Sequence, residues 1–164
     1  MNNTSQIGVL GLGAYVPERV LTNHDLEKMI DTSDEWITTR TGIKERRIAS
    51  EGEASSDLGA KAALKALEDA KVDPAEIDAI VVATLSPDHI FPATACIIQE
   101  KIGAVKAAAF DLSAGCSGFV YALAVAYGLV QTGLEKVLVI GAETISRFVN
   151  WQDRSTCVLF GDGA

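Results

Sequence analysis

The feature that most constrains the fold is an uninterrupted run of uncharged residues at positions 118–130, with the sequence GFVYALAVAYGLV. The run is long enough for roughly three and a half helical turns. A helix made from it has no polar face and must be covered on every side. The composition suits such a core, with 48% hydrophobic residues and 22% charged residues. The other segments of the chain supply less cover than this helix needs, which predicts that a further structural half completes its surroundings.

Three short apolar stretches, at residues 77–84, 107–112 and 137–142, are typical of buried strands. Helical patterns at residues 93–101 and 118–130 separate them. Strands that alternate with helices in this way form right-handed crossovers and a mostly parallel sheet. The sequence therefore predicts a layered α/β structure with helices on both faces of the sheet.

The flanking segments carry weaker signals. Residues 7–12 and 156–160 are predicted as strands, and residues 43–49 as a polar strand or an extended loop. Short helices are expected after Asn23 and after Thr32 or Ser33, the second one ending at Gly42. A longer amphipathic helix, capped by Ser55 or Ser56, presents its apolar side through Ala63, Ala66, Leu67 and Ala70.

Charge and cysteine content exclude several classes of function. The net charge is −8 and the pI is about 4.7, which argues against general nucleic-acid binding. Residues 1–6 lack the features of a signal peptide, and residues 118–130 are too short to span a bilayer. Three widely spaced cysteines and two distant histidines make a zinc site unlikely to form and indicate a reduced, cytoplasmic protein.

One cysteine lies where a predicted strand meets the apolar helix, in Ser113-Ala-Gly-Cys116-Ser-Gly-Phe119. Free N–H groups and the positive end of the helix dipole favour the thiolate at such a position. The small neighbours leave room for a substrate carbonyl to approach the sulfur and nearby N–H donors. The local pattern also fits a small hydrophobic residue packed in a tight turn, and by itself it favours that alternative.

Four stretches together resemble one known family. They are Asp34-Glu-Trp36-Ile-Thr-Thr-Arg40-Thr41-Gly42-Ile43, Phe91-Pro92-Ala-Thr-Ala-Cys96, the Cys116 segment, and Phe160-Gly-Asp-Gly-Ala164. In order and separation they are similar to the N-terminal half of β-ketoacyl-acyl carrier protein synthase III, the initiating condensing enzyme of bacterial fatty acid synthesis. The resemblance implies a thiolase-like fold of two similar halves around buried central helices, of which residues 1–164 form the first half.

The resemblance also implies the chemistry. An acyl group from acetyl-CoA, or another short acyl-CoA, is expected to move onto Cys116 and to condense with malonyl-acyl carrier protein. CoA and carbon dioxide are released, and the product is a 3-oxoacyl-acyl carrier protein. Acyl-CoA is a substrate here, so no cofactor and no metal are expected. The implied assembly is a homodimer that includes the C-terminal half, with no nucleic-acid or membrane partner.

Residue by residue, the match assigns Cys116 as nucleophile and Phe91 as an acyl-pocket residue that reaches across the dimer interface. The residues matched to CoA binding are Trp36, Arg40, Thr41 and Arg154. Stacking on adenine and pairing with phosphate are physically reasonable for tryptophan and arginine. Without the resemblance, Trp36 reads as a core aromatic and Arg40 as a solvated helix residue, and Phe91 fits plain core packing equally well.

Other parts of the family's site have no counterpart among these residues. The histidine and asparagine that assist decarboxylation belong to the C-terminal half of the family, and neither His24 nor His89 is expected to replace them. Cys96 and Cys157 are interpreted as packed and inert. The cluster Lys44-Glu-Arg46-Arg47 could face CoA phosphates or an acidic carrier protein, although alternating charges on an edge strand are the favoured interpretation.

Two alternatives to the lead hypothesis remain open at this point. A sister enzyme of the same architecture could make a polyketide or another β-ketoacyl starter, because the acyl pocket is completed elsewhere. A non-catalytic half could instead serve as a dimerisation or regulatory module. If the lead hypothesis holds, the 164-residue chain alone is expected to be inactive and insoluble, molten or self-associated through the apolar helix.

Overall fold

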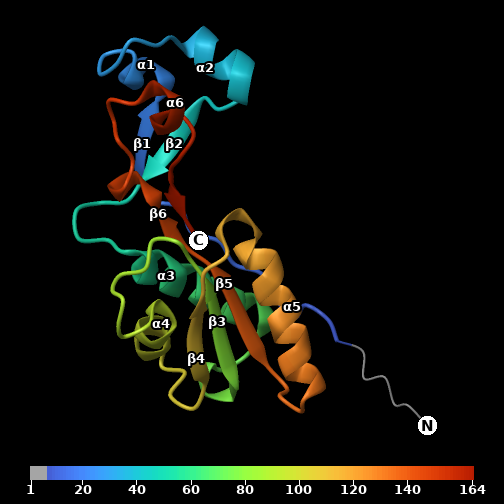
Figure 1. The fold of residues 1–164 in the computed structure, drawn as a ribbon. Coiled ribbons are helices and arrows are strands. Elements are labelled where there is room, and N and C mark those ends of the chain that lie inside the picture. Colours follow the sequence, from blue (N-terminus) through green and yellow to red (C-terminus); the bar gives the residue numbers. More distant parts are fainter. Residues whose placement is uncertain (1–6) are drawn as a thin grey trace.

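The computed structural model describes residues 7–164, so the N-terminal stretch examined for a signal peptide lies outside it. At its centre is a sheet of three strands, β3 (Ala79–Ala83), β4 (Ala108–Leu112) and β5 (Val137–Gly141), in the order β4-β3-β5 (Figure 1). Both pairings are parallel. The parallel sheet predicted from the alternating pattern is confirmed.

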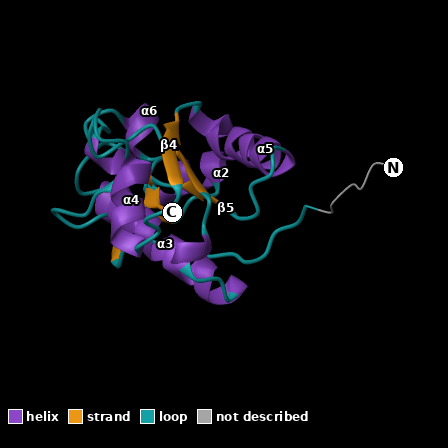
Figure 2. Ribbon diagram, turned by 90° about the horizontal axis from the view of Figure 1, so that it is seen from below, coloured by secondary structure: helices purple, strands orange, loops and turns teal. Residues whose placement is uncertain are grey.

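Helices cover both faces of this sheet, as predicted. In Figure 1, α3 (Ser55–Ala70) and α4 (Thr94–Ile102) lie on one side and α5 (Gly118–Gln131) on the other. A single 3₁₀ turn, η1 (Pro74–Glu76), precedes β3. Figure 2 shows the same helices around the sheet from below. Helix α3 begins at Ser55 after Ala54, so neither Ser55 nor Ser56 is its N-cap residue.

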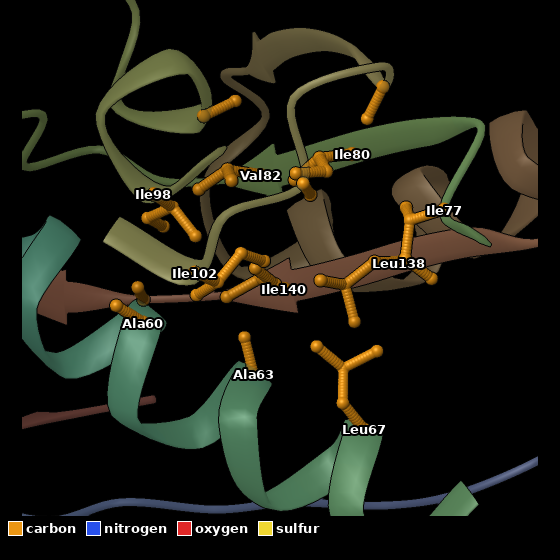
Figure 3. Packing of buried hydrophobic residues seen from close by; sticks show 14 residues of the cluster. Ala60, Ala63, Leu67, Ile77, Ile80, Val82, Ile98, Ile102, Leu138 and Ile140 are labelled. Atoms are coloured by element: carbon orange, nitrogen blue, oxygen red, sulfur yellow. The ribbon is translucent and has the colours of Figure 1, made fainter. Parts of the chain in front are cut away.

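The alternation of side chains along β3 connects the two layers. Ile80 and Val82 point into a core shared with α3 and α4, where Leu67 and Ile98 also pack (Figure 3). Val81 and Ala83 point the other way, toward α5. All five residues of β3 are buried, as expected for the central strand of a parallel sheet.

Helix α5 packs on the sheet through its smallest residues. Gly118, Ala122 and Ala126 are buried, and a Cβ at Gly118 would lie 3.2 Å from the Cβ of Ala83. Val125 and Leu129 are partly buried against the same cluster, whereas most of the other large residues of α5 are exposed. Those with at least 44% of their surface exposed are Phe119, Val120, Tyr121, Leu123 and Tyr127. The described residues thus leave one side of α5 uncovered, which confirms the predicted shortage of cover.

A second region, here called the ribbon module, lies beyond the end of the sheet (Figure 1). It is built on an antiparallel ribbon of β1 (Arg19–Thr22) and β2 (Glu45–Ile48). Three helices complete it: α1 (Asn23–Leu26), α2 (Asp34–Thr41) and α6 (Arg154–Cys157). Thr22 caps α1, so the expected cap residue Asn23 is instead the first residue of that helix. Ser33 caps α2, and Gly42 ends α2 in the left-handed conformation. The predicted helices and the strand at residues 43–49 are confirmed.

The ribbon module has a charged residue at its centre. Arg46 is 5% exposed and donates to the Oδ1 of Asn23 at 2.8 Å and to the carbonyl of Val158 at 2.8 Å. Arg47, on the other face of the ribbon, donates to the carbonyl of Pro17 and lies 3.7 Å from a carboxylate oxygen of Glu45. The sequence cluster at residues 44–47 is therefore not a free basic patch, which agrees with the favoured interpretation.

A buried carboxylate joins the two regions. Asp162 lies in the short strand β7 (Asp162–Gly163), which pairs with β6 (Glu143–Thr144). It accepts hydrogen bonds from the N–H of Ala49 at 2.6 Å and from both the N–H and the hydroxyl of Ser146. Ser146 belongs to the 3₁₀ turn η3 (Ile145–Arg147). One side chain thus holds the end of β2 against the segment that follows β5.

Two predicted strands are wrong. Residues 7–12 form no strand and run against α3, where a Cβ at Gly11 would come within 2.6 Å of the carbonyl oxygen of Ala66. No neighbouring strand pairs with them among the described residues, so β propensity alone does not make them a strand. Residues 156–160 contain the end of α6, because Asp153 caps that turn through the N–H of Ser155.

The described helices include no candidate membrane span. Within residues 7–164, none is both long enough and apolar enough to cross a bilayer.

Candidate active site at the start of helix α5

Cys116 lies on a short turn between β4 and α5, as the sequence predicts. The turn is the 3₁₀ helix η2 (Gly115–Ser117), and Gly115 has a φ of +58°. Such a left-handed conformation suits glycine, because a Cβ would clash there. The cysteine is exposed, so it is not the packed residue that the local pattern favoured.

The helix that follows Cys116 begins without a side-chain cap. Ser117 precedes α5 in a helical conformation, and its hydroxyl accepts no bond from the first turn. The other helices of residues 7–164 with at least eight residues all receive a side chain there. Ser33 caps α2, Asp88 accepts from the N–H of Ser56 in α3, and Asp111 accepts from two N–H groups of α4. The N–H of Gly118 donates to the carbonyl of Gly115, and no side chain competes with a ligand oxygen for the rest of this first turn.

The Asp111 carboxylate, five residues before Cys116, accepts hydrogen bonds from the first turn of α4. It lies on β4, the strand that leads to Cys116, and its two oxygens are 2.7 Å and 2.8 Å from the N–H groups of Thr94 and Ala95. The carboxylate closest to the cysteine along this strand is thus committed to α4. It does not place a negative charge at the first turn of α5.

The other two cysteines lie in different surroundings. Cys96 is partly buried on α4, with its Sγ 3.7 Å from the carbonyl of Ala109. Cys157 is fully buried on α6, and desolvation, together with the nearby charge of Asp153, raises the pKa of its thiol. Both therefore pack as the sequence predicts, although Cys157 does so on a helix and not on a strand.

Three of the four residues predicted to hold CoA meet on the ribbon module. The guanidinium carbons of Arg40 and Arg154 lie over the indole of Trp36, 4.5 Å and 4.7 Å from the ring centroid. Arg154 also donates to the carbonyl of Asp31 at 3.1 Å. Neither arginine forms an ion pair with a described carboxylate. Trp36 packs only partly against the core of the ribbon module, which leaves this cationic, aromatic surface open to a ligand.

The hydroxyl of the fourth residue, Thr41, is already hydrogen-bonded to backbone groups close in sequence. Its hydroxyl donates to the carbonyl of Ile37 at 2.8 Å and accepts from the N–H of Ile43 at 3.0 Å, which closes the end of α2. Phe91 is 88% exposed in the loop before α4, so plain core packing does not describe it. The structure thus groups Trp36 with both arginines but does not connect Phe91 with any other candidate.

Neither histidine takes part in this arrangement. His24 is exposed on α1, and a hydrogen bond and charge from Glu27 raise the pKa of its imidazole. His89 is exposed in the loop before α4.

Sequence reasoning missed one residue that shapes the site. Glu143 follows β5 and accepts from the N–H groups of Leu85 at 2.8 Å and Ser86 at 3.0 Å. It thereby fixes the loop after β3, and Leu85 lies 3.9 Å from where a Cβ of Gly115 would be. An acidic residue directly after a predicted buried strand is the signal that could have drawn attention to it.

Comparison with known proteins agrees with this geometry. The family model for 3-oxoacyl-[acyl-carrier-protein] synthase III matches residues 110–164. A beta-ketoacyl-[acyl-carrier-protein] synthase III of Caldanaerobacter subterraneus is 64% identical over 158 residues, which are 96% of this chain and 48% of that protein. The corresponding protein of Clostridium acetobutylicum is 58% identical over 98% of this chain and 49% of its own length.

Solved structures are similar throughout the described fold. The 3-oxoacyl-[acyl-carrier-protein] synthase III of Aquifex aeolicus VF5 has a TM-score of 0.91 and 57% identity, over 94% of this chain and 50% of that chain. A priming β-ketosynthase of the R1128 polyketide pathway also has a TM-score of 0.91, with 44% identity over 94% of this chain and 47% of that chain.

A parallel sheet between helix layers, with an exposed cysteine at the start of helix α5, corresponds to one half of a thiolase-like fold. The chain spans about half the length of the curated relatives it matches. Within this class, it matches the N-terminal half of β-ketoacyl-[acyl-carrier-protein] synthase III proteins.

Proposed function

We propose that this chain carries the nucleophile and part of the CoA site of an initiating condensing enzyme of fatty acid synthesis. The substrates would be acetyl-CoA, or another short acyl-CoA, and malonyl-acyl carrier protein. The protein would act as a homodimer in the cytoplasm and would need no cofactor. The observation that carries this proposal is the exposed thiol of Cys116 beside the uncapped first turn of α5.

In the first half-reaction, the Cys116 thiolate attacks the carbonyl carbon of the acyl-CoA thioester. The carbonyl oxygen gains negative charge, and N–H groups near the start of α5 that no side chain caps would stabilise it. The bond from this carbon to the CoA sulfur then breaks, and the CoA thiolate leaves. The products are an acylated Cys116 and free CoA, and covalent capture divides a difficult condensation into two steps.

Binding of CoA would use the arginine-flanked indole. Arg40 and Arg154 offer planar donors to phosphate oxygens, and the indole of Trp36 offers a surface on which adenine can stack. Neither arginine has a carboxylate partner to give up, so pairing with phosphate breaks no described ion pair.

In the second half-reaction, malonyl-acyl carrier protein loses carbon dioxide, and the electron pair of the broken bond forms a carbanion. The carbanion attacks the acyl carbon on Cys116, the thioester bond breaks, and the cysteine leaves as a thiolate. The resemblance assigns help with decarboxylation to a histidine and an asparagine that match no residue of this sequence.

Acyl transfer to the cysteine tests the proposal directly. Full-length protein incubated with acetyl-CoA should carry the acetyl group on the peptide that contains Cys116. The Cys116→Ser variant should lose this label together with condensation, whereas Cys96→Ser should retain both. Label on Cys96 or Cys157, or full activity of Cys116→Ser, would refute the assignment.

One observation supports a second candidate. The R1128 priming β-ketosynthase has the same TM-score as the Aquifex enzyme, so the fold does not separate a polyketide starter enzyme from a fatty acid one. The higher identity to the Aquifex enzyme, 57% against 44%, favours the fatty acid role. A panel of acyl-CoA substrates tested on full-length protein would distinguish the two.

A further inference from the structure

A half-open pocket of about 360 Å³ lies on one side of the ribbon module, apart from the residues assigned to Cys116 chemistry and to CoA. Two strands, the segment after α1, and the segment that begins at η3 surround it. Besides Ser146, the lining residues are Arg19, Leu21, Met29, Ile48, Arg147 and Trp151. The pocket thus combines two cationic side chains with an apolar wall.

The register of the ribbon explains this mixture. Arg19 pairs with Ile48 and Leu21 pairs with Arg46, so these four side chains share one face of the ribbon. Leu21 and Ile48 are buried and form the floor, and the exposed Arg19 stands at its edge. Arg47 occupies the opposite face of the same ribbon.

The cations around this pocket have no anionic partner. Arg19 and Arg147 form no ion pair with a described carboxylate, and Arg147 donates only to the backbone carbonyl of Glu53. The Glu53 carboxylate itself binds Lys61 at 2.6 Å. The carboxylate of Asp162, next to the lining residue Ser146, is occupied by hydrogen bonds from Ser146 and Ala49.

The buried Arg46 shares the ribbon face of Leu21 and Ile48, so it adds a third positive charge beside the floor of the pocket. Its guanidinium donates only to neutral acceptors, and its buried Nε has no hydrogen-bond partner. A carboxylate, that of Asp34, connects with it only through the amide of Asn23. Burying a charge without a counter-ion is costly, and a nearby anion would offset part of that cost.

We propose that this pocket binds an amphiphilic anion of the alkyl carboxylate class. The head group would pair with Arg19 and Arg147, and the chain would lie over Leu21, Ile48 and Trp151. A small inorganic anion would leave the apolar wall unused, and an uncharged lipid would leave the cations unpaired. The aromatic and thioether side chains of Trp151 and Met29 suit a flexible hydrocarbon. This site is independent of the proposed acyl transfer.

Calorimetric titration of full-length protein with sodium decanoate tests the proposal. Cys116 is first alkylated, so that binding next to the thiol is suppressed and the pocket is measured alone. We expect saturable binding, and the double variant Arg19→Gln/Arg147→Gln should weaken it by about tenfold or more. Decanol should bind much more weakly than decanoate, because it lacks the charged head group.

The matched control is Arg47→Gln, which removes an arginine from the opposite face of the same ribbon. It should change the decanoate Kd by less than about twofold, and neither variant should alter acyl transfer from acetyl-CoA. Thermal melts establish that each variant is folded. Absence of saturable binding, equal binding of decanol, or an equal loss in Arg47→Gln would overturn the proposal.

Discussion

The sheet region and the ribbon module handle charge in opposite ways. In the sheet region, Lys61, Lys101 and Lys136 each pair with a carboxylate at 2.6–2.9 Å, and the core beneath them is aliphatic. In the ribbon module, Arg40, Arg46 and Arg154 contact an indole, an amide or carbonyl oxygens, and no carboxylate. These three lysines are thus neutralised within the chain, whereas these three arginines have no carboxylate partner. Two other cations of the ribbon module, Lys28 and Arg47, do pair with Asp25 and Glu45.

This difference separates two tasks within one short chain. Parallel strands and close-packed helices fix the position of Cys116 with little help from charge. Recognition of an anionic ligand requires cations that are not already neutralised, and such cations are better tolerated at a small peripheral module. Four substitutions test the contrast, in order of expected effect.

Removal of the buried guanidinium should have the largest effect on stability. Arg46→Ala leaves the acceptors on Leu21, Asn23 and Val158 unpaired and opens a cavity, so we expect a loss of about 4 kcal/mol in the free energy of unfolding. Urea unfolding of full-length protein measures it. Arg47→Ala should cost less than about 1 kcal/mol. Equal losses would mean that Arg46 does not organise the module.

A cavity in the sheet region should cost slightly less. Ile80 is fully buried between β3 and the α3–α4 layer, so Ile80→Ala should reduce stability by about 3 kcal/mol. The exposed Leu64 on α3 provides the control, and Leu64→Ala should stay within about 0.5 kcal/mol. Equal losses of stability in Ile80→Ala and Leu64→Ala would contradict the role of Ile80 in the core between β3 and the α3–α4 layer.

Loss of one arginine beside Trp36 should act on binding and not on chemistry. Arg40→Ala should raise the KM for acyl-CoA by roughly tenfold to a hundredfold, equivalent to about 1.5–3 kcal/mol, through loss of a charge-assisted phosphate bond. Turnover of protein that is already acylated should hardly change. The exposed Lys44 offers a control, since Lys44→Ala removes a nearby cation with no described partner. A collapsed turnover number with an unchanged KM would place Arg40 elsewhere in the reaction.

The smallest effect concerns the exposed pair on α1. Hydrogen bonding to Glu27 raises the pKa of His24 above 6.5, so the protonated form is favoured in the folded state. Its contribution to stability is complete below pH 6.5 and disappears as the pH rises through the higher folded-state pKa. An NMR titration should show this elevation, and Glu27→Gln should remove it. An unshifted His24 in the parent protein would contradict the pairing.

The parts of the fold that the sequence predicted are those with strong local patterns. The apolar stretches of β3, β4 and β5 predict strands, although the edge strand β4 is not buried by the described residues. The uncharged run at residues 118–130 predicts a helix without a polar face. Cys116 could be placed because it falls between two such elements. The strand predicted at residues 7–12 is wrong because an apolar pattern does not specify whether a neighbouring strand is present to pair with it.

The parts that could not be predicted depend on contacts between distant segments. Nothing in the local sequence of Arg154 indicates that its guanidinium lies over Trp36, and nothing near Arg46 indicates that Val158 accepts its hydrogen bond. The resemblance to a known family placed Trp36, Arg40 and Arg154 in one site, whereas periodicity did not. The arginine-lined pocket had no sequence signal, because four separate segments form it.

The close approach of Gly118 to Ala83 has a mechanical consequence. Helix α5 has 14 residues and is about 21 Å long, and it contacts the sheet through Gly118 next to Cys116 and again through Ala122 and Ala126. A rigid rod held at several points along its length resists rocking. Rocking of the opposite end, where Tyr127 is exposed to any surface that packs against it, would reach the thiol strongly reduced. The reactive sulfur is thereby isolated from imperfections in the fit of whatever covers the rest of the helix.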